Sequence, residues 1–229
     1  MAVTQKLMEG LEAFGFSGEK LTDLSQKMDK YINEIILFNS AYNLTNTSDY
    51  DEIVVNHILD SLSAVSEIKL LLNQCGTEQE SVKIGDIGSG GGLPGIPLAA
   101  AMPEYKFVLV ERMDKRCAFL ENCAAILGLS NVSVMKKEAE KVPAESFDIA
   151  TFRAFRPLDE KMTKTLLNLT KKGGYLAAYK AKFSSIQIEM DGIKTLVKDY
   201  SVKKLTVPFL TENSSEQNRE RNLVVIQKC

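Results

Sequence analysis

The chain has 229 residues, of which 45% are hydrophobic, and this length and composition suffice to bury one sizeable core. Its 28 basic and 30 acidic residues give a formal net charge of -2. The chain as a whole therefore does not attract nucleic acid, and any contact with RNA must use a local basic surface. Four cysteines without a C-x-x-C pair, together with a single histidine, indicate neither a zinc site nor a disulfide framework. The N-terminus lacks an export signal and no apolar run reaches the roughly 18 residues of a membrane span, so we expect a cytoplasmic protein.

The first third of the chain has helical periodicity. Apolar residues recur at three-and-four spacing from Leu21 to Tyr42, which predicts a long amphipathic helix, and a second helical pattern runs from Ile53 to Ile68. The polar run 76–81 ends this pattern. We therefore expect a helical subdomain over residues 1–75 and a second domain over residues 82–229.

In the second domain, short β-rich apolar runs alternate with helical patterns. The runs are 82–87, 107–110, 132–135, 147–152, 175–179, 202–207 and 223–226. This alternation predicts an α/β fold, namely a doubly wound, mostly parallel sheet of seven strands with helices on both faces. Residues 208–222 are polar and turn-rich and leave no room for a helix, so we expect the last strand to return antiparallel to its neighbour.

A glycine-rich segment follows the first predicted strand. Residues 82–97 read as a strand, a tight turn and a helix that Pro94 or Pro97 could open, which brings the backbone close to a ligand at the carboxyl edge of the sheet. The run 90–95 satisfies the dinucleotide pattern G-x-G-x-x-G, but it starts two residues into the turn, whereas that pattern should begin as the strand ends.

An acidic residue stands two positions before the first glycine, in the pattern Asp86-x-Gly88-x-Gly90-x-Gly92. This arrangement resembles the first motif of class I methyltransferases, whose Rossmann-like fold binds S-adenosylmethionine. That cofactor carries a cationic amino group and a sulfonium, so a carboxylate near the loop is favourable there and would repel a pyrophosphate. We expect Ser89 to contribute to the same loop.

Two further acidic positions follow the second and third predicted strands. Glu111 ends the second strand, where a carboxylate can accept hydrogen bonds from both ribose hydroxyls of either nucleoside cofactor. Ala139 and Glu140 follow the third strand, at the place where class I methyltransferases contact the adenine. A solvated strand end is the alternative for Glu111, and an ordinary exposed turn is the alternative for Ala139 and Glu140.

The residue types narrow the kind of methylation. No cysteine lies near the fourth or fifth strand end, where pyrimidine C5 methyltransferases carry their nucleophile. The run 151–157 lacks the Asn/Asp-Pro-Pro-aromatic motif that usually accompanies adenine amine methylation. Guanine N7 has an exposed lone pair and no proton, so its methylation requires alignment and exclusion of water but no general base.

Several runs together resemble the glucose-inhibited division protein B family of small-subunit (16S) ribosomal RNA guanine-N7 methyltransferases. They are 39–45, 57–61, 86–97, 153–155 and 221–226, and the resemblance spans roughly residues 30 to 226. It implies cofactor contacts at Gly88, Leu93, Ala139, Glu140 and Arg153, with Glu111 in the ribose position. Asn56 stands where family members often have arginine, which removes one candidate RNA contact.

Arg153 lies at the carboxyl end of the fourth predicted strand. It could pair with the cofactor carboxylate or an RNA phosphate and so position a substrate, but a structural salt bridge to Asp86 or Asp148 is the alternative. His57 can share a helix face with Asp60 and is interpreted as a buried histidine capped by a neighbour, without a catalytic role.

Basic residues near the predicted strand ends are candidates for RNA binding. The proposed contacts are Lys115, Arg116, Lys180 and Arg221, and separate solvated helix ends are the alternative. We expect small-subunit ribosomal RNA as the partner, a monomeric protein and no metal. The competing functions are a methyltransferase of another RNA or of a small molecule, a nicotinamide oxidoreductase, and a non-catalytic nucleoside-binding regulator. An oxidoreductase would need a proton donor, and the chain has no Tyr-x-x-x-Lys motif.

Overall fold

The computed structural model describes residues 3–154, 156–211 and 219–229. The helices are α1 (Gln5–Ala13), α2 (Gly18–Tyr42), α3 (Tyr50–Ile53), a π-helix (Val54–Leu59), α4 (Asp60–Leu62), α5 (Val65–Cys75), α6 (Gly95–Ala101), α7 (Asp114–Ile126), α8 (Glu160–Leu169) and α9 (Phe183–Gly192). Short 3₁₀ turns occupy Gln79–Ser81 and Ala139–Lys141. The strands are β1 (Lys83–Ile87), β2 (Lys106–Glu111), β3 (Val132–Lys136), β4 (Phe147–Arg153), β5 (Thr170–Lys180), β6 (Ser201–Lys204) and β7 (Asn222–Gln227).

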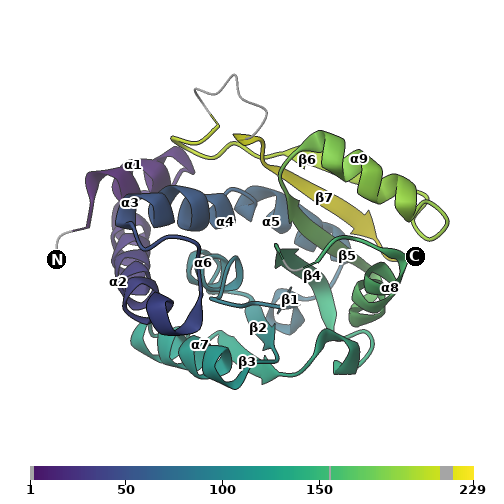
Figure 1. The fold of residues 1–229 in the computed structure, drawn as a ribbon, viewed down its shortest axis with the longest axis horizontal. Coiled ribbons are helices and arrows are strands. Elements are labelled where there is room, and N and C mark those ends of the chain that lie inside the picture. The colour runs from purple at the N-terminus through teal and green to yellow at the C-terminus, as the bar shows by residue number, and fades with distance from the viewer. Residues whose placement is uncertain (1–2, 155, 212–218) are drawn as a thin grey trace.

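The seven strands form one sheet in the order β3-β2-β1-β4-β5-β7-β6 (Figure 1). β1 to β5 are parallel to their neighbours, whereas β7 is antiparallel to both β5 and β6. The expected doubly wound sheet and its antiparallel last strand are therefore confirmed. The order reverses beside β1, and the loops at the carboxyl ends of β1 and β4 diverge there, which is where open α/β sheets bind ligands.

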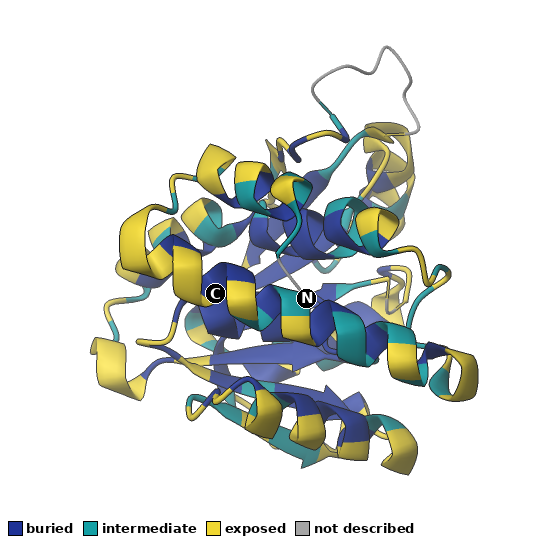
Figure 2. Cartoon of the chain, turned by 90° about the vertical axis from the view of Figure 1, so that its left-hand side faces the viewer, coloured by how far each residue is buried: buried dark blue, intermediate teal, exposed yellow. Residues whose placement is uncertain are grey.

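Helices cover both faces of the sheet. α5 and α6 pack on one face through residues such as Ile68 and Leu98, and α8 and α9 pack on the other through residues such as Leu166 and Ile186. The outer helix surfaces are exposed while the strands between them are buried (Figure 2). Burial on both faces explains why the central strands read as continuous apolar runs instead of alternating ones.

The N-terminal helices share a hydrophobic cluster with the sheet helices. Met28, Tyr31 and Ile35 of α2 belong to the same buried group as Ile96 of α6 and Phe119 of α7. The division into residues 1–75 and 82–229 stays a prediction, because one apolar cluster spans both parts. Among the described residues, no helix combines the length and apolar character needed to cross a membrane.

The second predicted helix differs most from its prediction. The pattern from Ile53 to Ile68 predicts one helix, but this stretch contains α3, the π-helix, α4 and the start of α5. The wider turns of a π-helix alter the backbone hydrogen bonding without changing the apolar spacing greatly, so periodicity does not reveal it. The sequence pattern does not predict helix α1. Strand β5 begins five residues before the predicted run 175–179, and β6 ends at Lys204, before the end of the predicted run 202–207. Part of the turn-rich segment 208–222 lies outside the described residues.

Candidate active site

The loop after β1 crosses the carboxyl edge of the sheet in a conformation that favours glycine. Gly88, Gly90 and Gly92 have φ angles of 68°, 59° and 91°. A Cβ atom on Gly92 would lie 2.6 Å from Ile96 Cγ1 and 2.9 Å from the Tyr31 hydroxyl. Backbone conformation and crowding thus both require glycine at this position. Tyr31 also donates a hydrogen bond to the Gly91 carbonyl, which ties α2 to the loop.

Asp86 lies beneath this loop and holds it to the following helix. Its Oδ2 accepts hydrogen bonds from Ser89 Oγ at 2.6 Å and from the backbone nitrogen of Gly95, the first residue of α6, at 3.0 Å. Burial raises the pKa of Asp86 to about 6, although these two hydrogen bonds oppose the increase. Asp86 is only 1% exposed, and its hydrogen bonds organise the loop. Its buried Oδ1 has no protein partner among the described residues.

A cavity of about 660 Å³ opens beside the loop, within the size range of ligand sites. Four of the predicted cofactor residues line it, and these are Gly88, Glu111, Ala139 and Glu140. Its other walls include Arg112, Arg116, Lys137, Glu138, Ala154, Arg156 and Lys161. The carboxyl ends of three neighbouring strands therefore bring together side chains that are distant in the sequence.

Glu111 is fixed in this cavity by backbone donors. Its Oε2 accepts from the Gly90 nitrogen at 3.0 Å, and its Oε1 accepts from the nitrogens of Arg112 and Met113 at 2.8 and 2.9 Å. A carboxylate has about four lone-pair sites, so these three bonds leave it capacity for a hydroxyl. The remaining predicted cofactor residues of the loop, Ser89, Gly90 and Leu93, shape it without lining the cavity, and Leu93 packs into the core.

A second cavity, of about 550 Å³, lies next to the first. It is lined by Asn56, His57, Asp60, Arg153, Ala154, Arg156, Pro157, Tyr179, Lys180, Ala181, Glu189, Leu205 and Arg221. Ala154 and Arg156 line both cavities. Two ligand-sized cavities therefore meet at the loop after β4.

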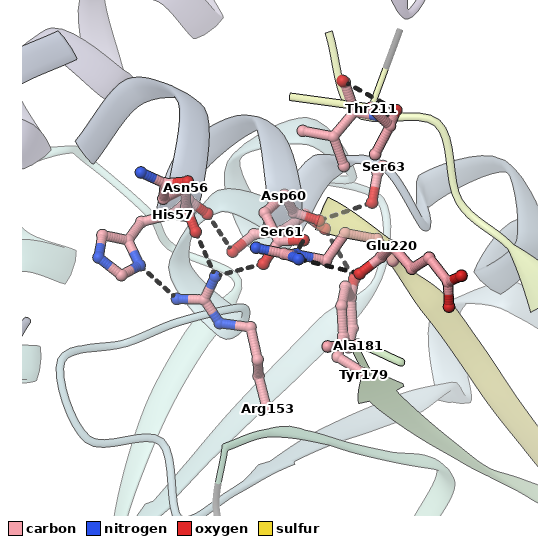
Figure 3. Close-up of polar contacts among 12 residues, drawn as sticks. Asn56, His57, Asp60, Ser61, Ser63, Arg153, Tyr179, Ala181, Thr211 and Glu220 are labelled. Carbon is pink, nitrogen blue, oxygen red and sulfur yellow. Dashed lines mark hydrogen bonds and ion pairs between the residues drawn. The ribbon is translucent and has the colours of Figure 1, made fainter. Parts of the chain in front are cut away.

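Arg153 is anchored to the N-terminal helices across the second cavity (Figure 3). One guanidinium nitrogen donates to the Asn56 carbonyl at 3.0 Å and pairs with Asp60 Oδ2 at 2.7 Å, while the other lies 3.0 Å from His57 Nδ1. Arg221 Nε lies 3.1 Å from the other oxygen of Asp60. The structural salt bridge expected for Arg153 thus exists, but its partner is Asp60 and not Asp86 or Asp148.

His57 is held neutral in this cluster. Burial, and then the positive charges of Arg153 and Arg221, lower the pKa of His57 to about 3. Because Nδ1 accepts from Arg153, Nε2 carries the proton of the neutral ring, and it is buried without a partner among the described residues. A ring with such a low pKa is a poor general base near neutral pH.

The sequence and the fold place this chain among known methyltransferases. The family model described as rRNA small subunit methyltransferase G (GidB) matches residues 24–224. The chain belongs to this family. The Ribosomal RNA small subunit methyltransferase G of Treponema denticola is 40% identical to it, over 97% of this chain and 93% of that protein. The protein of the same name from Treponema pallidum is 39% identical, over 81% of this chain and 80% of that protein.

Solved structures agree on the fold. The crystal structure of a tRNA methyltransferase from Aquifex aeolicus has a TM-score of 0.55 and 14% sequence identity, over 73% of this chain and 69% of that one. At this level of identity the likeness concerns the fold alone, a class I methyltransferase sheet with its helices.

With the family known, the predicted RNA contacts fall into three places. Lys180 and Arg221 line the second cavity, Arg116 lines the first and donates to the Asn43 carbonyl at 3.0 Å, and Lys115 is exposed on α7. Lys180 is not a free cation, because its Nζ bonds Glu189 Oε2 at 2.6 Å. The role of these four basic residues in RNA binding stays a prediction. Phe155, the last residue of the family run 153–155, lies outside the described residues.

Sequence reasoning missed several residues of the site. The sequence indicates Asp60 only as a neighbour of His57, although it pairs with two arginines. Tyr31 falls within the apolar stripe of the predicted helix from Leu21 to Tyr42, and its hydrogen bond to the glycine loop is not predicted. Nothing in the local sequence marks Glu189, since its contacts depend on how α9 packs over β5.

Proposed function

We propose that this chain transfers the methyl group of S-adenosylmethionine to N7 of one guanine in small-subunit (16S) ribosomal RNA. The observation that carries the proposal is the pair of adjoining cavities at the carboxyl edge of the sheet. One is built on the glycine loop and fits a nucleoside cofactor. The other, which meets it at Ala154 and Arg156, is large enough for an acceptor base.

The residues of the first cavity fit the proposed cofactor. The carboxylate of Glu111 would accept from a ribose hydroxyl, and the backbone at Gly88 and Ala139 lets the nucleoside approach closely. Glu140 lies at the cavity wall proposed for the adenine, and the cations Arg116 and Arg156 face a cavity that must also accept a carboxylate. When bound, the cofactor supplies an electrophilic methyl group on a sulfonium.

The chemistry of the second cavity supports an acceptor without a proton to remove. Its one histidine has a pKa of about 3 and already accepts from Arg153 through Nδ1. The N7 lone pair forms the new bond to the methyl carbon as the bond from carbon to sulfur breaks, and the positive charge passes to the purine ring. Such a transfer needs alignment of the acceptor nitrogen with the methyl group. Fixed side chains such as Arg153 and Asp60 give the cavity a rigid wall that can hold the acceptor in place.

The finer features of the substrate and setting belong to the same proposal. A single chain contains both cavities, so we propose that it acts as a monomer. We also propose a cytoplasmic location, because the proposed substrate is ribosomal. Phosphates around the cavities would be contacted by Lys115 and Arg116 of α7 and by Arg221, which directly precedes β7. We propose that residues 1–75 form a helical subdomain that supports the glycine loop of the catalytic domain, residues 82–229, because α2 contacts this loop.

Transfer of labelled methyl groups tests the proposal directly. The protein would be incubated with labelled S-adenosylmethionine and either ribosomal RNA or intact small subunits from cells that lack it, and the modified base would then be mapped. We expect N7-methylguanine at one position. Methylation of another atom would contradict the proposed acceptor, and cofactor binding without any transfer would favour the non-catalytic regulator.

A further inference from the structure

Two carboxylates line the second cavity, and Glu189 is the more exposed of the two, whereas Asp60 lies buried between two arginines. Asp60 places its two oxygens against Arg153 and Arg221, at 2.7 and 3.1 Å. Glu189 of α9 accepts from Lys180 Nζ at 2.6 Å and from the Leu158 nitrogen at 3.0 Å, and both bonds fall on Oε2. The described residues offer no donor to Glu189 Oε1, although the side chain lines the cavity and is 23% exposed.

These two bonds also fix where the Glu189 carboxylate lies. Lys180 ends β5 at the carboxyl edge, and its ammonium also lies 5.6 Å from the centre of the Phe152 ring. Leu158 precedes α8 and is buried. The Glu189 carboxylate is therefore attached to two separate elements at the cavity wall, so its Oε1 is preorganised and loses little rotamer freedom when it binds a ligand.

We propose that Glu189 recognises the acceptor guanine, by accepting hydrogen bonds from the N1–H and the 2-amino group on the Watson–Crick edge. This inference rests on the proposed function. Guanine presents donors at this edge, whereas adenine presents an acceptor at N1, so an acceptor-only carboxylate selects guanine. The N7 atom lies on the opposite side of the purine, so a base held through this edge directs N7 away from Glu189.

The charge of Glu189 also suits the reaction. Methylation at N7 leaves a positive charge on the purine, which makes N1–H a stronger donor as the new bond forms. A carboxylate acceptor at N1–H therefore binds the transition state more tightly than the ground state. We accordingly expect Glu189 to act on kcat more than on KM.

The test compares the target guanosine with inosine, which lacks the 2-amino group. Small subunits would be reconstituted with a ligated RNA that carries either nucleoside at the mapped position. We expect wild-type protein to lose about tenfold in kcat/KM on inosine, the range for one recognised base edge. Glu189→Gln keeps an acceptor for the Leu158 nitrogen, and we expect it to lose about tenfold on guanosine and to differ less than twofold between the two substrates.

A merely structural Glu189 would give a different result. If it only anchored α9, Glu189→Gln would lower both rates by the same factor and keep the wild-type ratio of guanosine to inosine, which would overturn the inference. Equal wild-type rates on the two substrates would overturn it as well. Asp191→Asn, on the same helix but exposed and outside the cavity, is the matched control and should keep the wild-type ratio.

Two measurements keep this test separate from the proposed function. S-adenosylmethionine affinity, measured by calorimetry, should be equal in wild type and Glu189→Gln, and this equality shows that the variant folds. If Glu189→Gln does not fold, Glu189→Asp takes its place in the test. If wild-type protein transfers no methyl group to the unsubstituted guanosine, the proposed function fails and the inference falls with it. If transfer occurs and only the ratio is insensitive to Glu189, the inference alone fails.

Discussion

Replacing Asp60 by alanine should strongly destabilise the fold. The Asp60 side chain is 6% exposed and lies between two guanidiniums whose side chains are 14% and 21% exposed. Removing the carboxylate leaves two largely buried cations close together without a counter-charge. Breaking a buried pair in this way costs roughly 3 to 5 kcal/mol, and the lower end applies here because both arginines also line a cavity. We therefore expect a loss of about 3 kcal/mol in the free energy of unfolding.

Urea unfolding followed by circular dichroism would measure this loss. With an m-value of about 3 kcal/mol/M, the midpoint should fall by about 1 M. Asp60→Asn, which keeps the size of the side chain but removes its charge, should give most of the same shift if electrostatics dominates. Asp191→Ala, at an exposed position of α9, is the control and should change stability by less than about 0.5 kcal/mol. A shift for Asp60→Ala no larger than the control's would refute the reasoning.

Three further predictions concern the histidine, the glycine loop and the RNA contact. In the folded protein His57 has a pKa of about 3, below its ordinary 6.5, so the stability it contributes above pH 6.5 is lost as the pH falls toward 3. His57→Gln should therefore reduce the loss of unfolding free energy between pH 7 and 4 by up to roughly 3 kcal/mol. Parallel plots of urea-derived unfolding free energy against pH for wild type and variant would contradict this. Gly92→Ala should lower S-adenosylmethionine affinity at least tenfold by calorimetry, an order-of-magnitude figure for a distorted loop, whereas Gly128→Ala, also at positive φ but in open space, should leave it unchanged. Arg221→Ala should weaken RNA binding in a filter assay and leave cofactor affinity nearly unchanged, and an equal loss of both would argue against separate roles.

The sequence predicts the architecture well because the relevant signals are local. Strands buried on both faces appear as continuous apolar runs, and the glycines at 88, 90 and 92 predict a loop whose positive φ angles favour glycine. The turn-rich segment before Asn222 likewise leaves no room for a crossover helix, which implies an antiparallel last strand. The candidate cofactor residues Gly88, Glu111, Ala139 and Glu140 line one cavity, and the sequence predicts them together because the carboxyl ends of parallel strands meet at one edge.

The sequence by itself thus determined the sheet, the glycine loop and the strand-end residues of the first cavity. Only the tertiary structure decided the partners of the charged residues in the second cavity. Arg153 and Asp60 are 93 positions apart, and neither local spacing nor composition selects one carboxylate from the 30 acidic residues of the chain. The same holds for Lys180, whose pairing with Glu189 depends on how α9 crosses the end of β5. Backbone periodicity is recorded locally in a sequence, whereas the pairing of charges is set by which elements the packed core brings together.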